Sequence, residues 1–268
     1  MTTDTLQQLT TNALATLADA LDRGHIDALT TTLRAMSRFH RYSFGNICLI
    51  ASQRPDATRV AGFTAWKALH RFVRKGEHGI AILAPIVRQR RDDDGEPWHA
   101  IVGFRTAYVF DVNQTDGEPL PELASATGDP GDTAAKLTAA IHAHGIRLEF
   151  ADNLGGALGL SCGGRIELQR NLPPATEVLV LAHEFAHELL HRGSDRPESR
   201  DTRELEAQAV SFIVCEAVGL QSLAPTVDYL HLYRGDRDGL AASLDRIQRA
   251  SATIIRALEV FPEMDRTR

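Results

Sequence analysis

The sequence predicts a two-domain α+β protein, in which N-terminal helices with a small antiparallel sheet precede a second domain built around one apolar helix. Three observations support this architecture. The pattern HExxH lies in an apolar stretch at 178–191, positive charge is concentrated between Ser37 and Arg91, and a stretch at 113–133 is rich in Asp, Gly, Pro and Thr. A length of 268 residues is sufficient for two domains of ordinary size.

The composition is that of a globular chain, with 43% hydrophobic and 24% charged residues. No apolar run approaches the roughly 18 residues that a membrane-spanning helix needs, which argues against a membrane protein. The three cysteines, Cys48, Cys162 and Cys215, are odd in number and form no CxxC pair. Together with the absence of a signal peptide, they predict a cytoplasmic protein.

The N-terminal part is predicted to be mainly helical. Leucines at helical spacing, from Leu6 to Leu21, mark the first helix, and Pro55 ends the third. Helices are expected at 5–23, 26–36, 43–52 and 63–73. Strands are expected at 79–87 and within 98–112, on either side of an acidic turn at 92–95.

The stretch at 113–133 is expected to contain the domain boundary. It places a first domain at 1–118, a linker at 119–133 and a second domain at 134–268. In the second domain, Gly163-Gly164 indicates a tight hairpin between the short runs 157–161 and 165–168. Helices are expected at 134–144, 178–191, 202–218 and 239–260, with a strand at 146–150.

The helix at 178–191 carries the pattern HEFAH at 183–187. Positions four apart lie on one face of a helix, so the imidazoles of His183 and His187 project from the same side. They offer two ligands to Zn²⁺, and Glu184 can act on a water that the metal binds. The flanking residues are apolar, which predicts burial, and a metal removes the cost of burying these polar groups. The alternative is a core helix whose histidines are satisfied by hydrogen bonds alone.

A catalytic zinc site needs a third protein ligand. The helix at 202–218 offers Glu204, Glu206 and Glu216. Residues three, four, seven and eleven positions after Glu206 are all apolar, whereas those after Glu204 are more polar, so Glu206 is the expected ligand and a surface carboxylate is its alternative role. His191 lies one turn beyond His187 and is expected to support the site rather than bind metal, because a straight helix drifts by about 40° over four residues.

The net charge of −6 hides a strong asymmetry. Between Ser37 and Arg91 there are eleven Lys or Arg residues and two acidic ones, a net charge of +9 against −15 elsewhere. Such a block predicts a polyanionic partner. Its amphipathic rings Tyr42 and Trp66 are candidates for stacking on the bases of a single strand. The alternative is a solvated basic surface that faces the acidic half.

Four runs in the N-terminal part form a dense pattern: YSFGN at 42–46, QRPDATRVAGF at 53–63, VRKGEHGI at 73–80 and YVFDVNQT at 108–115. This pattern resembles the N-terminal domain of ArdC-type antirestriction proteins over about residues 5–118, although the family usually has Trp in place of Phe44 and Lys in place of His78. The resemblance implies single-stranded DNA binding. The side chains expected to contact DNA are Arg38, Arg41, Tyr42, Ser43, Asn46, Arg54, Arg59, Trp66, Lys67, Arg71, Arg74 and Lys75.

The second domain carries a further resemblance. HEFAHELLH at 183–191 and ELEAQAVSF at 204–212 resemble the C-terminal domain of the same proteins, which is similar to the ImmA/IrrE metallopeptidases and more distantly to Spartan-like proteases. A helix-borne glutamate as third ligand makes the domain look like a gluzincin, one class of the zincin fold. The resemblance implies one Zn²⁺ per chain, peptide hydrolysis with Glu184 as general base, and protection of incoming plasmid DNA.

Three functions remain open at this point. The first is a DNA-directed metallopeptidase that acts in antirestriction on a restriction protein or another DNA-bound protein. The second is a DNA-binding shield whose zinc site is catalytically silent, and the third is a regulatory protease that cleaves a repressor. Glu184 favours catalysis, because a structural site has no use for a general base. Tyr229, His231 and Tyr233 are candidate oxyanion donors, among which no spacing rule selects.

Overall fold

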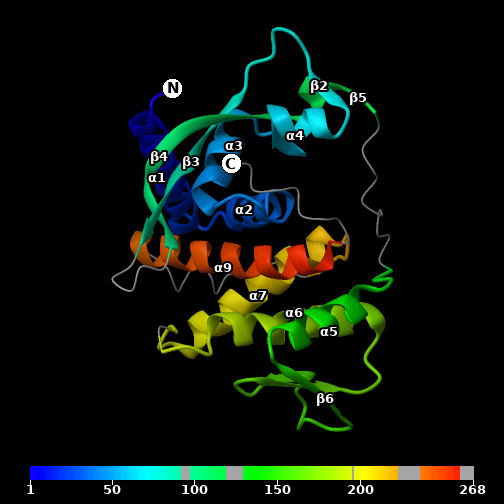
Figure 1. Ribbon diagram of the computed structural model, residues 1–268. Helices are drawn as coiled ribbons and strands as arrows, with labels where there is room; N and C mark the ends of the chain where they lie inside the picture. The colour runs from blue at the N-terminus through cyan, green and yellow to red at the C-terminus, as the bar shows by residue number, and fades with distance from the viewer. Residues whose placement is uncertain (92–96, 119–128, 195, 223–235, 260–268) are drawn as a thin grey trace. The chain divides into compact units, whose positions relative to one another are not determined.

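The structure is a computed structural model that describes residues 1–91, 97–118, 129–194, 196–222 and 236–259 (Figure 1). Contacts between Cα atoms divide the chain into two compact units, both of which contain helices and strands. The predicted α+β class is therefore confirmed. No helix in these ranges is long and apolar enough to cross a membrane.

The N-terminal unit comprises Met1–Thr16 and Gly45–Leu120, and the C-terminal unit comprises Leu17–Phe44 and Pro121–Arg268. Residues 17–44, expected from the sequence in the first domain, thus group by contacts with the C-terminal unit. Residues 119–128 of the expected linker lie outside the described residues. The functional boundary at 119–133 therefore remains a prediction.

The sheet of the N-terminal unit is built on one long hairpin. β3 (Ile80–Arg91) and β4 (Pro97–Asp111) pair antiparallel with one register shift, and β1 (Val60–Gly62) adds to the other side of β4. The strand order β1-β4-β3 leaves one edge of β3 without a strand partner among the described residues. The other elements are α1 (Thr3–Asp22), which continues into the C-terminal unit, α3 (Phe44–Gln53), α4 (Phe63–Ala68), β2 (Arg71–Val73), the 3-10 turn η1 (Val112–Gln114) and β5 (Thr115–Gly117).

Two amides of α3 cover the edge of β3. The side chain of Asn46 donates to the carbonyl of Leu83 and accepts from its N–H, both at 2.9 Å. Gln53 does the same for Ala81, at 2.8 and 3.0 Å. An open strand edge exposes unpaired N–H and C=O groups, and these side chains replace the missing strand.

The helix predicted at 63–73 is shorter in the structure. α4 ends at Ala68, and His70 adopts a positive φ of 55°, which takes the chain out of the helix. Residues 71–73 form β2 instead and pair antiparallel with β5. Strand pairing with a distant segment overrides the local helical pattern here.

The C-terminal unit combines a mixed three-stranded sheet with packed helices. β8 (Arg165–Gln169) lies in the centre, parallel to β6 (Arg147–Ala151) and antiparallel to β7 (Gly159–Ser161). The loop between β7 and β8 contains Gly163 and Gly164, both at positive φ, so the predicted tight hairpin is confirmed. The helices are α2 (Ile26–Arg38), α5 (Thr133–Ala143), α6 (Pro174–Leu190), α7 (Arg200–Ala217) and α9 (Arg237–Leu258).

α6 lies at the centre of this unit and packs against α5, α7, α9 and the strands β7 and β8. Its apolar residues Val178, Leu181 and Phe185 are fully buried, as are Phe212 and Ile213 of α7. Pro174 stands in the first turn of α6, where its missing N–H costs nothing, and Glu177 is the acidic residue of that turn. The HExxH pattern is therefore carried by a helix whose position is fixed on several sides.

Candidate metal centre

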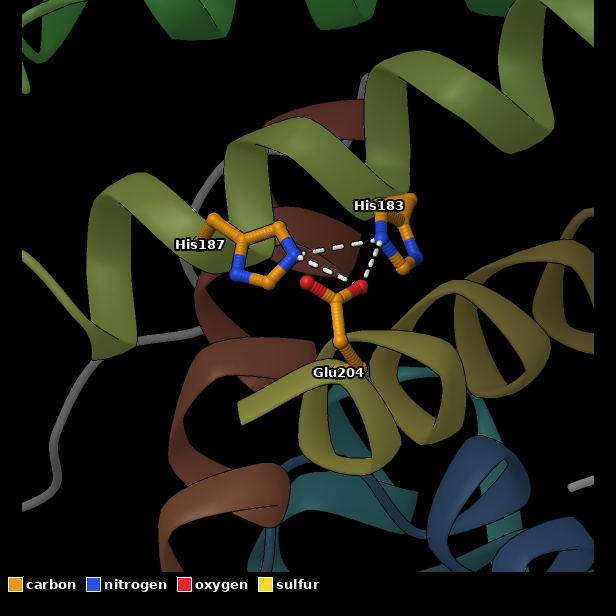
Figure 2. A group of neighbouring side chains, drawn as sticks. All are labelled: His183, His187 and Glu204. Carbon is orange, nitrogen blue, oxygen red and sulfur yellow. Dashed lines mark hydrogen bonds and ion pairs between the residues drawn. The ribbon is translucent and has the colours of Figure 1, made fainter. Parts of the chain in front are cut away.

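Three potential ligand atoms converge between α6 and α7 (Figure 2). The Nε2 atoms of His183 and His187 lie 3.1 Å apart. Glu204 Oε2 lies 3.5 Å from His183 Nε2 and 3.6 Å from His187 Nε2. Among the described residues, this is the only group of three or more His, Cys, Asp or Glu side chains that is close enough to hold an ion.

These spacings fit a tetrahedral metal site. Ligand atoms about 2.0–2.1 Å from a tetrahedral zinc stand roughly 3.3 Å from one another, which matches the three separations found here. The two imidazoles have side chains 26% and 14% exposed, whereas that of Glu204 is 49% exposed. The group is thus closed on the helix α6 side and open on one side, as a site that receives a substrate requires.

The surroundings keep both imidazoles neutral at neutral pH. Burial lowers the pKa of His183, and Glu204 only partly opposes this effect. Burial and the neighbouring His183 lower the pKa of His187 to about 4. A neutral imidazole is the form that binds metal, so the ligands are already in the required state.

Glu184 lies next to this group on α6 and is a buried carboxyl. Burial, followed by the nearby charge of Glu204, raises its pKa to about 7, while the backbone N–H of Ser161 donates to it and limits the rise. Gly159 in β7 lies so close that an added Cβ would be 2.6 Å from Val180 Cγ1 and 2.8 Å from Glu184 Cγ. A carboxyl with a pKa near the working pH suits a group that both takes and gives a proton.

A cleft of about 500 Å³ opens over the metal group and Glu184. Its lining combines the edge of β7 with one face each of α6 and α7. The lining residues are Leu158, Gly159, Leu179, Val180, His183, Glu184, Glu204, Gln208 and Ser211.

Glu206, expected from the sequence as third ligand, is not beside the two imidazoles. Its carboxylate is 0% exposed and bonds to His191 Nε2 at 3.0 Å and to Arg246 of α9. Glu204 lies beside the two imidazoles instead. His191 contacts His187, with their Nδ1 atoms 2.9 Å apart, and lies outside the metal group as expected.

The choice between the two glutamates shows what the helical pattern can and cannot indicate. Periodicity correctly identified Glu206 as the buried one. The site, however, opens to the cleft, which is lined by the more polar face of α7 through Glu204, Gln208 and Ser211. The buried carboxylate is satisfied by Arg246, which is distant in sequence and gives no local signal.

Of the two rings selected for base stacking, Trp66 is buried and Tyr42 is only partly exposed. Trp66 is 2% exposed and its indole N–H donates to the carbonyl of Phe110 at 2.9 Å. Tyr42 is largely buried, which raises its pKa to about 12, and its carbonyl accepts from Gln248. Asn46 is 9% exposed, and its side-chain amide is hydrogen-bonded to the backbone of Leu83 in β3.

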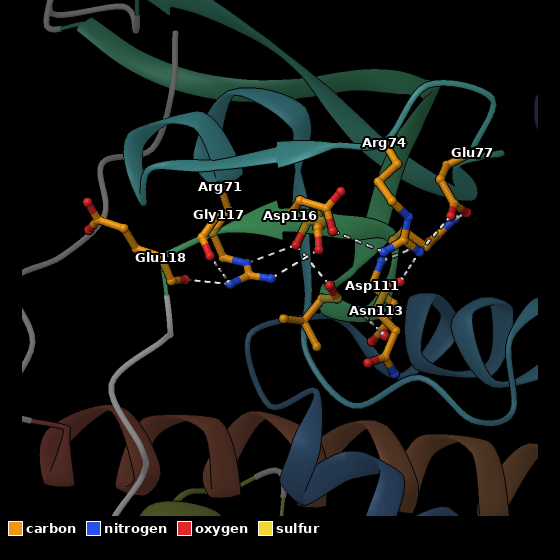
Figure 3. Close-up of polar contacts among 11 residues, drawn as sticks. Arg71, Arg74, Glu77, Asp111, Asn113, Asp116, Gly117 and Glu118 are labelled. Carbon is orange, nitrogen blue, oxygen red and sulfur yellow. Dashed lines mark hydrogen bonds and ion pairs between the residues drawn. The ribbon is translucent and has the colours of Figure 1, made fainter.

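Two arginines of the basic block bond to acceptors of their own unit (Figure 3). Arg71 donates to Thr115 Oγ1 at 2.9 Å and to the carbonyls of Thr115, Gly117 and Glu118. Arg74 pairs with Glu77 at 2.8 Å and with Asp116 at 3.4 Å. Both tie β2 to β5 and the residues around them.

The other expected DNA contacts are spread over both units. In the C-terminal unit, Arg41 pairs with Glu259 at 2.6 Å. In the N-terminal unit, Arg54 pairs with Asp56 at 3.5 Å, whereas Lys67 and Lys75 are exposed and form no ion pair with any described residue. Arg38, Ser43 and Arg59 take part in interactions within the protein.

Two residues of the site were not identified from the sequence. Gly159 and Ser161 in β7 contact Glu184, and only the fold brings them there, since no motif marks them. The candidate oxyanion donors Tyr229, His231 and Tyr233 lie outside the described residues.

Comparison with known proteins gives two family models, one for each half of the chain. Residues 4–110 match the model of the N-terminal domain of anti-restriction factor ArdC, and residues 141–240 match that of the IrrE N-terminal-like domain, Peptidase_M78. An uncharacterized Bacillus anthracis protein, pXO2-81, is 24% identical over an alignment of 241 residues, and the match covers 73% of this chain. The chain spans only 41% of that relative.

Two solved structures of the antirestriction ArdC protein from plasmid R388 are also similar. The metal-free one has 22% identity and a TM-score of 0.45, covering 80% of this chain and 84% of that one. The Mn(II)-bound one has 18% identity and a TM-score of 0.44, covering 87% and 98%. The chain therefore contains an ArdC N-terminal domain followed by an IrrE-like metallopeptidase domain, which is the arrangement of the ArdC-type antirestriction proteins that its sequence resembles.

Proposed function

We propose that this protein is a zinc-dependent peptidase of the antirestriction class, which binds single-stranded DNA and protects incoming plasmid DNA by cleaving a restriction protein or another DNA-bound protein. The observation that carries the proposal is the convergence of His183, His187 and Glu204 beside the buried carboxyl of Glu184. A purely structural metal site does not need a proton acceptor at its open side.

In this proposal, His183, His187 and Glu204 hold one zinc ion per chain. Two imidazole nitrogens and one carboxylate oxygen are a ligand set that suits zinc. When bound, the ion supplies Lewis acidity for a peptide carbonyl and lowers the pKa of water toward 7. Glu184 takes the proton of the attacking water and delivers it to the leaving amine, which its pKa of about 7 permits at neutral pH.

The edge of β7 is the proposed binding place for the peptide. β7 pairs with β8 on one side, and no described strand pairs with its other side. The N–H of Ser161 points from that free side to Glu184, and Gly159, two residues away, presents its backbone to the same side. An extended peptide added there would run along the cleft past the metal group.

DNA binding is proposed for the exposed rings of the N-terminal unit rather than for the buried Trp66. Phe63, Phe72, Phe104 and Tyr108 are 47–57% exposed. Phe104 and Tyr108 lie on one face of β4, because side chains two and four apart on a strand share a face. Rings at the surface can stack on unpaired bases.

Cations accompany these rings. Lys67, Lys75, Arg88 and Arg105 are exposed and form no ion pair with any described residue. They are therefore available to phosphates, unlike Arg71 and the other arginines that bond within the protein. Binding should weaken as salt increases, because each phosphate contact releases counterions.

The DNA proposal is tested with Tyr108→Ala and Phe104→Ala. Each variant should lose about 1–3 kcal/mol of affinity for a single-stranded oligonucleotide while keeping its melting temperature. Phe150→Ala is the matched control, since Phe150 is also an exposed strand ring, at 42%, but lies in the other unit. Equal affinities in all three variants and the wild type would reject these rings as a binding surface.

The peptidase proposal is tested by comparing wild type with Glu184→Gln. Both proteins, loaded with zinc, are incubated with candidate restriction subunits, with and without single-stranded DNA, and fragments are identified by mass spectrometry. Fragments should form only with the wild type. In restricting cells, Glu184→Gln should also fail to protect unmodified plasmid DNA, whereas equal protection by both would favour the DNA shield.

A further inference from the structure

A chain of polar side chains, buried except for the partly exposed Arg246, lies behind His187, on the side away from the cleft. His187 Nδ1 is 2.9 Å from His191 Nδ1, and His191 Nε2 is 3.0 Å from Glu206 Oε2. Glu206 in turn bonds to Arg246 of α9. We refer to Arg246, Glu206 and His191 as the buried relay. It connects three helices, α6, α7 and α9, to one metal ligand.

The far end of the buried relay fixes a negative charge on Glu206. Arg246 Nε donates to Oε1 at 3.1 Å and to Oε2 at 3.4 Å, and its Nη2 donates to Oε1 as well. With the guanidinium of Arg246 bonded to both of its oxygens, this buried side chain is paired as a carboxylate. The carboxylate can therefore only accept hydrogen bonds.

The charged Glu206 determines where the protons lie on His191 and His187. Because Glu206 only accepts, His191 carries its proton on Nε2. A second proton on His191 would add a buried cation where Arg246 already balances the carboxylate, so His191 Nδ1 is an acceptor. The proton between the two Nδ1 atoms then belongs to His187, and the Nε2 atom of His187 is left with a free lone pair.

We propose that the buried relay is a positioning device that holds His187 in the tautomer whose Nε2 lone pair faces His183 and Glu204. This is the tautomer that a metal ligand needs, and the relay selects it before any ion arrives. The inference rests on the proposed metal site. Its residues are positioning residues, because none of them contacts the place where the ion would bind.

The plain alternative is that the relay only ties the helices together. Removal of the negative charge on Glu206 distinguishes the two roles, because that charge sets which nitrogen donates and which accepts in each hydrogen bond of the relay. In Glu206→Gln, the amide oxygen accepts from Arg246 and the amide N–H₂ faces His191. The proton of His191 then moves to Nδ1, which donates to His187 Nδ1, and His187 carries its proton on Nε2. A structural tie would be weakened by this change but has no reason to reverse a tautomer.

The experiment measures long-range ¹H–¹⁵N spectra of histidine side chains in the metal-free protein at pH 8, together with zinc affinity by chelator competition. In the wild type, His187 should be protonated at Nδ1. In Glu206→Gln it should be protonated at Nε2, and zinc affinity should fall about 10- to 100-fold. An unchanged His187 tautomer in Glu206→Gln would overturn the proposal.

Glu188→Gln is the matched control. Glu188 is also a buried carboxylate, but it accepts from the hydroxyl of Ser161 and the N–H of Gly164, neither of which belongs to the relay. This variant should keep the tautomer of His187 and a zinc affinity close to that of the wild type. A tautomer change in the control as large as that in Glu206→Gln would also contradict the relay, since it would show a general response to lost charge.

A second variant serves if Glu206→Gln does not fold. His191→Phe keeps an aromatic ring and removes the acceptor for His187 Nδ1, so the preference for the Nδ1-protonated tautomer should be lost. Retention of that preference would overturn the relay. If the wild type binds no zinc, the proposed metal function fails, but the spectra of the metal-free protein still decide whether the relay operates.

Discussion

The metal centre and the basic segment from Ser37 to Arg91 differ in how their polar groups are used. At the metal centre, His183, His187 and Glu204 turn toward one point, and only Glu204 has a further charged contact among the described residues, a long one of 4.0 Å with Arg200. In the basic segment, Arg71 and Arg74 turn toward acceptors of the same unit. A motif with fixed helical spacing thus identified a site, whereas an excess of charge identified mainly internal contacts.

The reason for the difference is geometric. Two residues four apart on a helix must share a face, whatever the rest of the chain does. A cluster of cations in sequence has no such constraint, and a long side chain can bond to acceptors of its own unit, as Arg71 does to three carbonyls. Surface charge therefore has to be judged after the internal partners are known.

Trp66→Ala should have the largest effect and tests the basic segment. The ring is 2% exposed, so its removal leaves a cavity and should lower the free energy of unfolding by about 3–5 kcal/mol. Denaturant unfolding measures this change. Trp66→Phe, which keeps most of the ring, should cost much less. A fully stable Trp66→Ala protein with weakened DNA binding would return Trp66 to the DNA surface.

Asn46→Ala should be next in size. It leaves the N–H and C=O of Leu83 in β3 without their partners, at a cost of about 2–3 kcal/mol. The affinity of the folded fraction for single-stranded DNA should not change. The control is Lys67→Ala, at an exposed residue of the same unit, and it should leave stability unchanged. Weakened DNA binding with full stability in Asn46→Ala would contradict the covering role.

Gly159→Ala tests the metal centre. The new Cβ would collide with Val180 and Glu184, so we expect a loss of about 1–3 kcal/mol in the free energy of unfolding and a displaced Glu184. Zinc affinity should change little, because Gly159 contacts none of the three ligands. The control is Gly62→Ala, because an added Cβ at Gly62 would meet no atom within 4 Å. A variant as stable and active as wild type would remove Gly159 from the site.

Glu259→Gln should have the smallest effect and a defined pH dependence. Burial raises the pKa of Glu259, but hydrogen bonds from His40 and Arg41 outweigh it and lower the pKa to about 2 from 4.5. The folded state thus favours the charged carboxylate, so the stabilisation is complete above pH 4.5 and is lost as the pH falls toward 2. We expect Glu259→Gln to lower the free energy of unfolding by about 1–2 kcal/mol, a value discounted for the partial exposure of the pair.

The measurement for this variant is the difference in unfolding free energy between wild type and Glu259→Gln as a function of pH. The difference should be constant above about pH 5 and shrink below it. Glu216→Gln breaks a more exposed pair with Arg34 and should cost no more than about 1 kcal/mol. A difference that grows as the pH falls would contradict the assigned role of Arg41.

Much of the fold could be predicted from sequence because the helices have strong local patterns. The helix that carries His183 and the hairpin at Gly163 were both anticipated and are confirmed. The short strands β1, β2 and β5 were not, since three residues carry no periodic signal and depend on distant partners. At the site, two of the three metal-group residues were predicted. The third, Glu204, depends on where α9 places Arg246, which takes up the competing Glu206.

The most direct test of the account is zinc binding by Glu204→Ala, measured by chelator competition beside wild type and Glu184→Gln. The wild type should bind about one zinc per chain. Glu184→Gln should bind it nearly as well, because Glu184 is not in the ligand group, and Glu204→Ala should bind at least about 100-fold more weakly. Wild-type zinc affinity in Glu204→Ala would contradict the proposed metal centre.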